Sequence, residues 1–191
     1  MVRVDVPRED AVALQFRIVT TRLGELAFVF DERGLRRVLL PQPAGPRGLR
    51  AAVKREFPAA REDSRLAPRL AGQLQRYFDG ERIEFDVQLN LEAESATEFR
   101  RAVWLACHQI PYGQTTTYGD LARRVGHPRA ARAVGTAMRS NPCPIIIPCH
   151  RVLGCNDCLG GYSAPGGIEF KRRLLEMEGA TFRTALKEEP V

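Results

Sequence analysis

Residues 118–142 read YGDLARRVGHPRAARAVGTAMRSNP, which places a helical pattern on each side of Gly126. The apolar spacing and the glycine predict a short helix over 118–125 and a second one from about residue 129 to residue 140. Two helices joined by so short a turn predict a helix-turn-helix. The second helix of such a pair usually faces nucleic acid.

The basic side chains of the chain concentrate around this helix pair. Residues 100–140 hold seven arginines against one acidic residue, Asp120. Residues 1–99 carry 16 basic and 16 acidic side chains, so the whole net charge of +6 lies in the second half. This bias favours a polyanionic partner such as nucleic acid, although a solvated basic face with no ligand has the same composition.

The second predicted helix carries small residues around its arginines, so the arginine side chains would project above their neighbours. Arg132 and Arg139 would stand above a surface that could approach a sugar-phosphate backbone closely, or that could serve tight helix packing instead. The small residues are Ala130, Ala131, Gly135 and Ala137.

The next segment, residues 141–153, reads NPCPIIIPCHRVL. Its prolines remove backbone donors and favour extended neighbours, so we expect residues 145–147 to form a short buried strand that fixes Cys149 in place. A thiol is nucleophilic as its thiolate, and a neighbouring histidine or arginine can raise the thiolate fraction. In an extended backbone Cys149 and His150 diverge, so contact between them needs a turn or a water. Alternatively, Cys149 is a buried small hydrophobe.

The five cysteines are an odd number in a chain of this size, which indicates free thiols in a reducing compartment. No run of about eighteen apolar residues is present, so we expect no membrane partner and a cytoplasmic location. Cys155 and Cys158 have C-x-x-C spacing, but a second ligand pair is missing. A zinc site, a regulatory disulfide and two incidental thiols all remain open. We predict no metal and no cofactor.

The first half predicts an antiparallel meander with two helices. Residues 11–21, 24–32 and 35–41 have strand patterns, with a hairpin turn at 31–34. Apolar spacing of three and four predicts amphipathic helices over 47–57 and 66–79. Residues 82–91 alternate like a strand or an extended crossover, and the acidic residues 92–97 suggest a boundary between two subdomains.

A capped helix after Thr97 opens the second half, and a turn-rich connector follows it at 110–117. The predicted fold class is therefore α+β. Its predicted parts are an N-terminal α/β domain over residues 1–95, a mainly helical domain over 96–182 and a flexible tail over 183–191.

Several motifs together resemble one family. IPCHRV at 147–152 is preceded by YGQTTTYGDLA and AARAVGTAMRSNP and followed by GGYS and KRRLLEMEG. From about Glu98 to Gly179 the chain is similar to the O6-alkylguanine-DNA alkyltransferases, also called methylated-DNA–protein-cysteine methyltransferases. The resemblance implies a ribonuclease-H-like N-terminal domain and direct, irreversible transfer of the alkyl group from O6-alkylguanine in duplex DNA to Cys149, in one turnover.

The resemblance also implies roles for particular residues. His150 would draw the thiol proton through a water, Glu178 would support His150, Asn141 would brace the network, and Tyr118 would donate to the flipped base. Arg132 would enter the base stack. The expected DNA-contacting set is completed by Tyr118, Ala130, Ala131, Gly135, Arg139 and Arg151, and the expected pocket is formed by Met138, Pro144, Val152, Tyr162 and Ser163.

The implied partner is double-stranded DNA, bound by a monomer through the minor groove with little sequence preference. Two features depart from the family pattern: the extra residues Ala164 and Pro165, and the pair Cys155 and Cys158. A DNA-binding redox or zinc sensor without transfer activity is the alternative, and a cysteine hydrolase is a third possibility. A hydrolase needs an oxyanion site that the sequence does not indicate.

Overall fold

The chain is a mixed α+β structure, seen in a computed structural model that describes residues 13–41, 45–92 and 96–183. Strands β1 (Gln15–Thr21), β2 (Gly24–Asp31) and β3 (Gly34–Leu39) form the predicted antiparallel meander. A two-residue strand, β4 (Arg61–Glu62), pairs in parallel with β1 and completes the order β3-β2-β1-β4. The sequence did not predict β4.

Alternation along β2 explains how both faces of the sheet are covered. Leu26 and Phe28 point into the core that contains α2 (Pro68–Phe78), whereas Ala27 and Val29 point into a smaller core with α1 (Gly45–Glu56). Successive side chains of a strand point to opposite faces, so the run GELAFVFD supplies both layers. Helices α1 and α2 confirm the helices predicted over 47–57 and 66–79.

The segment at 82–91 is an extended crossover along the sheet. Its backbone flanks β3, because Leu35 donates to Gln88 (2.8 Å) and Asn90 donates to the carbonyl of Leu35 (2.9 Å). The chain then enters the helical half through residues 93–95, which lie outside the described residues. The suggested boundary at 92–97 therefore falls largely on undescribed residues.

Four α-helices lie in the described part of the second half: α3 (Glu98–His108), α4 (Tyr118–Arg124), α5 (Ala131–Arg139) and α6 (Gly167–Met177). The hydroxyl of Thr97 accepts from the Arg100 amide and that of Thr117 from the Asp120 amide, so each caps its helix. Trp104 donates its indole N–H to the Ala137 carbonyl (2.8 Å). Ala137 is buried, so it serves helix packing rather than an exposed small-residue surface.

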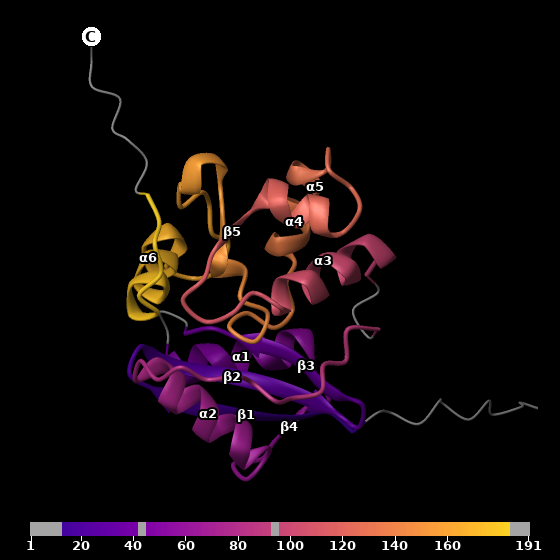
Figure 1. Ribbon diagram of the computed structural model, residues 1–191. Helices are drawn as coiled ribbons and strands as arrows, with labels where there is room; N and C mark the ends of the chain where they lie inside the picture. The colour runs from indigo at the N-terminus through magenta and orange to yellow at the C-terminus, as the bar shows by residue number, and fades with distance from the viewer. Residues whose placement is uncertain (1–12, 42–44, 93–95, 184–191) are drawn as a thin grey trace, which may run out of the picture.

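The two halves share one continuous hydrophobic core. Figure 1 shows the sheet and α2 on one side of the molecule and α3 to α6 on the other. Val38 of β3 donates to the Pro142 carbonyl (2.9 Å), which ties the sheet to the segment that leads to Cys149. Two further two-residue strands, β5 (Thr116–Thr117) and β6 (Val152–Leu153), pair in parallel and join the start of α4 to the same segment.

Across the described ranges, none of the helices has the length and apolar character needed to cross a membrane. Of the predicted flexible tail, all but Arg183 lies outside the described residues.

Candidate active site

A tight turn, not a strand, delivers Cys149. Ile145 has a φ of 77°, and the Ile147 amide donates to the Cys143 carbonyl (2.8 Å), so the three isoleucines bend back on themselves. The predicted strand at 145–147 is therefore wrong. Asn141 holds the turn at two points, since its Nδ2 donates to Ile147 O (2.8 Å) and its Oδ1 accepts from the Cys143 amide (3.0 Å). Asn141 was expected to brace this segment, and these two hydrogen bonds are its contacts with the turn.

Cys149 begins a short 3-10 helix, η2 (Cys149–Arg151), and is 7% exposed. Its Sγ lies 4.0 Å from the hydroxyl oxygen of Tyr162, within the range of a hydrogen bond to sulfur. Burial raises the pKa of the thiol, while hydrogen bonding with Asn141 and Tyr162 and the charge of Lys171 oppose that rise. The thiol is therefore held protonated at rest, among groups that favour its thiolate.

His150 and Glu178 form a buried pair behind the thiol. His150 Nε2 lies 2.9 Å from Glu178 Oε1, and neither side chain is exposed to solvent. Burial lowers the pKa of His150, so the ring is neutral at rest. Its Nδ1 is buried and has no hydrogen-bond partner among the described residues. The ring therefore has its second nitrogen free to accept a proton.

Arg151 completes this network and is not at the surface. Its Nε donates to Glu178 Oε2 (2.8 Å), its Nη2 to Glu178 Oε1 (2.9 Å) and its Nη1 to the Ile110 carbonyl (2.6 Å). Burial opposes ionisation of Glu178, but the hydrogen bonds and charges of His150 and Arg151 hold its pKa well below the usual range. The assignment of Arg151 to DNA contact is wrong, because its guanidinium is buried against a carboxylate.

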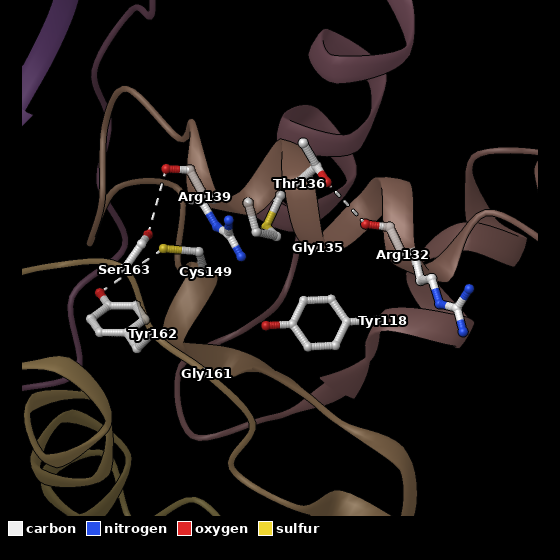
Figure 2. Close-up of a pocket in the computed structure, with 10 residues that line it drawn as sticks. Tyr118, Arg132, Gly135, Thr136, Arg139, Cys149, Gly161, Tyr162 and Ser163 are labelled. Atoms are coloured by element: carbon white, nitrogen blue, oxygen red, sulfur yellow. Dashed lines mark hydrogen bonds between the residues drawn. The ribbon is translucent and has the colours of Figure 1, made fainter.

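The predicted pocket lies directly beside Cys149. A cavity of about 470 Å³ is lined by residues of α4, α5 and the loop that follows η3 (Cys155–Asp157). Figure 2 shows Tyr118 between Arg132 and Cys149, with its hydroxyl directed toward the cysteine side. Burial, followed by the proximity of Cys149, raises the pKa of Tyr118, which therefore remains a hydrogen-bond donor. The cavity brings together Tyr118, Arg132, Gly135, Met138, Arg139, Cys149, Tyr162 and Ser163, all predicted, with Thr136 and Gly161.

A second cavity of about 380 Å³ also has Cys149 in its lining. It contains the predicted Pro144, the extra residues Ala164 and Pro165, and a wall from β3. Val152 lines neither cavity, since it is fully buried in β6, so its pocket assignment is wrong. Ala130 and Ala131 lie half-buried where α5 begins, away from both linings.

Two residues of the site were missed by the sequence reasoning. Lys171 is fully buried in α6, donates to the Val152 carbonyl (2.6 Å), and has its pKa lowered by burial to about 8. Its position on the same helix face as Leu174 and Leu175 was a usable signal, because a lysine there must be buried. Tyr77 of α2 donates to Glu178 Oε1 (2.6 Å), although its spacing indicated only a core position.

Cys155 and Cys158 lie apart from this network. Cys155 is exposed and Cys158 half-buried, and both are free thiols. Within the described part of the chain, no group of three or more His, Cys, Asp and Glu side chains is placed to hold a metal ion. The zinc-sensor alternative therefore has no support from these residues.

Comparison with known proteins identifies relatives of this chain. The family model described as "6-O-methylguanine DNA methyltransferase, DNA binding domain" matches residues 98–180. A methylated-DNA–protein-cysteine methyltransferase of Methanosarcina acetivorans is 39% identical over 168 residues, which cover 87% of this chain and 99% of the relative. The protein of that name from Mycobacterium tuberculosis strain H37Rv is 53% identical over 106 residues, 56% of this chain and 61% of the relative.

Solved structures agree with these relatives. The crystal structure of Mycobacterium tuberculosis OGT in complex with DNA has a TM-score of 0.73 and 38% identity, and the match covers 86% of this chain and 92% of that one. The O6-methylguanine-DNA methyltransferase of Pyrococcus kodakaraensis has a TM-score of 0.63 and 27% identity, with 86% and 99% covered.

Proposed function

The chain belongs to the methylated-DNA–protein-cysteine methyltransferase family, and from that premise we propose that Cys149 is the residue that accepts the alkyl group. The protein repairs DNA by alkyl transfer to cysteine. The observation that carries the assignment is the position of Cys149: it lines a cavity between Tyr118 and Tyr162, with the buried His150–Glu178 pair following it.

The buried network accounts for activation of the thiol. The Nε2–H group of His150 donates a hydrogen bond to Glu178 and keeps its proton. The unpartnered Nδ1 can then take the thiol proton through a water. Glu178 then stabilises the imidazolium that forms, whereas the positive charge of Arg151 opposes it. Because the pKa of His150 is lowered, the ring starts neutral and can act as a base at neutral pH.

The transfer is a displacement at carbon. The sulfur of Cys149 forms a bond to the alkyl carbon as the bond from that carbon to O6 of guanine breaks, and the electron pair passes to the purine. The Tyr118 hydroxyl donates a hydrogen bond to the departing base and stabilises the negative charge that the base gains, and a proton from solvent then makes the ring neutral. The product is a thioether that neither water nor a second thiol readily cleaves, so each protein molecule acts once.

DNA binding places the lesion in the pocket. We infer that α4 and α5 form a helix-turn-helix that lies in the minor groove and contacts mainly the backbone, with little sequence preference. Flipping a nucleotide costs a few kcal/mol, which is offset by pocket contacts and by Arg132 filling the vacated stack. The exposed side chain of Arg132 at the cavity edge supports this role.

The remaining assignments belong to the same proposal. The N-terminal part, residues 1–95, is a ribonuclease-H-like domain, residues 96–182 form the alkyltransferase domain, and the protein acts as a cytoplasmic monomer.

Replacing Arg132 by alanine is expected to slow methyl transfer by about tenfold or more, because no side chain then fills the place in the base stack that the flipped nucleotide leaves. Single-turnover rates on duplex DNA containing O6-methylguanine measure this effect. Arg82→Ala removes the same charge from an exposed site in the N-terminal crossover and should leave the rate unchanged. Equal losses in both variants would show that only net charge matters and would contradict the proposed role.

The function itself is tested by stoichiometry. With excess duplex DNA containing O6-methylguanine, we expect one lesion to be repaired per protein molecule, with no further turnover. Continued turnover, or complete persistence of the lesion, would overturn the proposal.

A further inference from the structure

Tyr77 brings a hydroxyl from the N-terminal half into the buried network of the other half. It lies in α2, is fully buried, and donates to Glu178 Oε1 over 2.6 Å. The same hydroxyl oxygen is 3.4 Å from His150 Nε2. A phenol 101 residues before Glu178 in the sequence therefore touches both members of the pair behind Cys149.

Aromatic packing fixes the position of this hydroxyl. The Tyr77 ring is in edge contact with Phe78 and Tyr112, at centroid distances of 5.2 and 6.2 Å, and lies 5.7 Å from the ring of Phe85. Burial and the nearby Glu178 carboxylate raise the pKa of Tyr77 well above its ordinary value, so the phenol keeps its proton. Tyr77 thus acts as a rigid donor toward Glu178.

The donors around Glu178 determine where the proton of His150 must lie. Oε1 accepts from Tyr77, from Arg151 and from His150, while Oε2 accepts from Arg151 and from the Gly113 amide (3.3 Å). A carboxylate held from so many sides cannot rotate away from the imidazole. Since an ionised carboxylate only accepts, the facing Nε2 must carry the proton of the neutral ring, and Nδ1 is left unprotonated.

We propose that Tyr77 is a positioning residue for alkyl transfer: its hydroxyl fixes the Glu178 carboxylate so that His150 keeps its proton on Nε2 and offers Nδ1 as the base. This inference rests on the proposed function. It gives the N-terminal half a part in the chemistry, because that half supplies the donor that holds the carboxylate in place.

Tyr112 provides a matched control, since it also bridges the two halves. Its hydroxyl lies within hydrogen-bond distance of Gly80 O (3.1 Å) and Met177 O (3.2 Å), both backbone carbonyls. A phenylalanine at either position keeps the ring and removes only the hydroxyl. Loss of the Tyr112 hydroxyl therefore removes a bridge between the halves without removing a contact to the Glu178 carboxylate.

The experiment compares Tyr77→Phe with Tyr112→Phe by three measurements: the methyl-transfer rate at saturating O6-methylguanine duplex, the DNA affinity, and the His150 tautomer seen by nitrogen-15 NMR of labelled imidazoles. For Tyr77→Phe we expect a rate about tenfold lower at unchanged DNA affinity, because a hydrogen bond to a charged group is lost. We also expect His150 to populate both tautomers. Tyr112→Phe should lower the thermal midpoint but keep the wild-type rate and the Nε2–H tautomer.

Three results would overturn the inference. One is a wild-type rate and tautomer in Tyr77→Phe, and another is an equal loss of rate in both variants, in proportion to lost stability. The third is an Nδ1–H tautomer in the wild-type protein, which decides the question even if Tyr77→Phe does not fold. If the wild-type protein takes no methyl group onto Cys149, the proposed function fails instead, and the tautomer measurement still tests the role of Tyr77.

Discussion

Replacing Cys149 by alanine is expected to abolish methyl transfer while leaving DNA binding intact. The attacking sulfur is removed, and alanine offers no atom that can form a bond to the alkyl carbon. The side chain is small, buried and part of the cavity lining, so the surfaces of α4 and α5 that are proposed to contact DNA should be unchanged. Incubation of the variant with duplex DNA containing O6-methylguanine should leave every lesion in place, and a binding assay should give the wild-type affinity.

Cys143→Ala is the matched control for this variant. Cys143 is also buried, and it begins the turn that leads to Cys149, six residues before it. We expect Cys143→Ala to repair the lesion at close to the wild-type rate. Repair by Cys149→Ala, or loss of repair in Cys143→Ala with a folded protein, would show that the acceptor has been assigned to the wrong thiol.

The largest effect on stability is expected for Glu178→Gln. Removing the carboxylate charge leaves Arg151 buried without its ionic partner, and breaking a buried pair in this way costs about 3–5 kcal/mol. The pKa of Glu178 is held below its ordinary value of 4.5, so its contribution is present above that pH and is lost as the pH falls below it. Urea unfolding at neutral pH should show the full difference from wild type, and the difference should shrink in acid.

Glu169→Gln tests whether this loss comes from burial. Glu169 is paired with Arg172 on the same helix, but that pair is exposed, and exposed pairs contribute about 0–1 kcal/mol. We therefore expect Glu169→Gln to unfold close to wild type. Similar losses in both variants would contradict the account of the buried network.

Much of the fold was predictable because its signals are local. The meander follows from alternation in three adjacent runs and a turn at 31–34, and the helices follow from apolar spacing and, for α3, from the cap at Thr97. The strands β4, β5 and β6 have two residues each and pair with distant segments. Nothing in so short a run distinguishes a strand from a loop, so their pairing could not be predicted.

The turn at the three isoleucines shows tertiary structure overriding a local preference. Ile145 to Ile147 have high strand propensity, yet Ile145 takes a positive φ that is unfavourable for a β-branched residue. Asn141 bonds to both ends of the turn, and Pro142 accepts from Val38 of the distant strand β3. These contacts hold a conformation that the tripeptide alone does not favour.

The motifs identified part of the candidate site, but two residues assigned with them, Arg151 and Val152, are buried and were assigned wrongly. Cys149, His150 and Glu178 followed from a family resemblance, and the structure brings His150, the residue after the cysteine, within hydrogen-bond distance of Glu178. Arg151 was assigned to the DNA-contacting set, but its guanidinium is buried against Glu178. Its partner, Glu178, lies 27 residues later at the end of α6, and no local sequence pattern indicates that pairing.

The most direct test of the central claim is to map the site of alkylation by peptide mass after one turnover. The wild-type protein, mixed with duplex DNA containing O6-methylguanine, should gain one methyl group on the peptide that carries Cys149. Cys107, Cys143, Cys155 and Cys158 should remain unmodified. A methyl group on any of those four cysteines, or an unmodified protein beside intact lesions, would contradict the assignment of Cys149 as the acceptor.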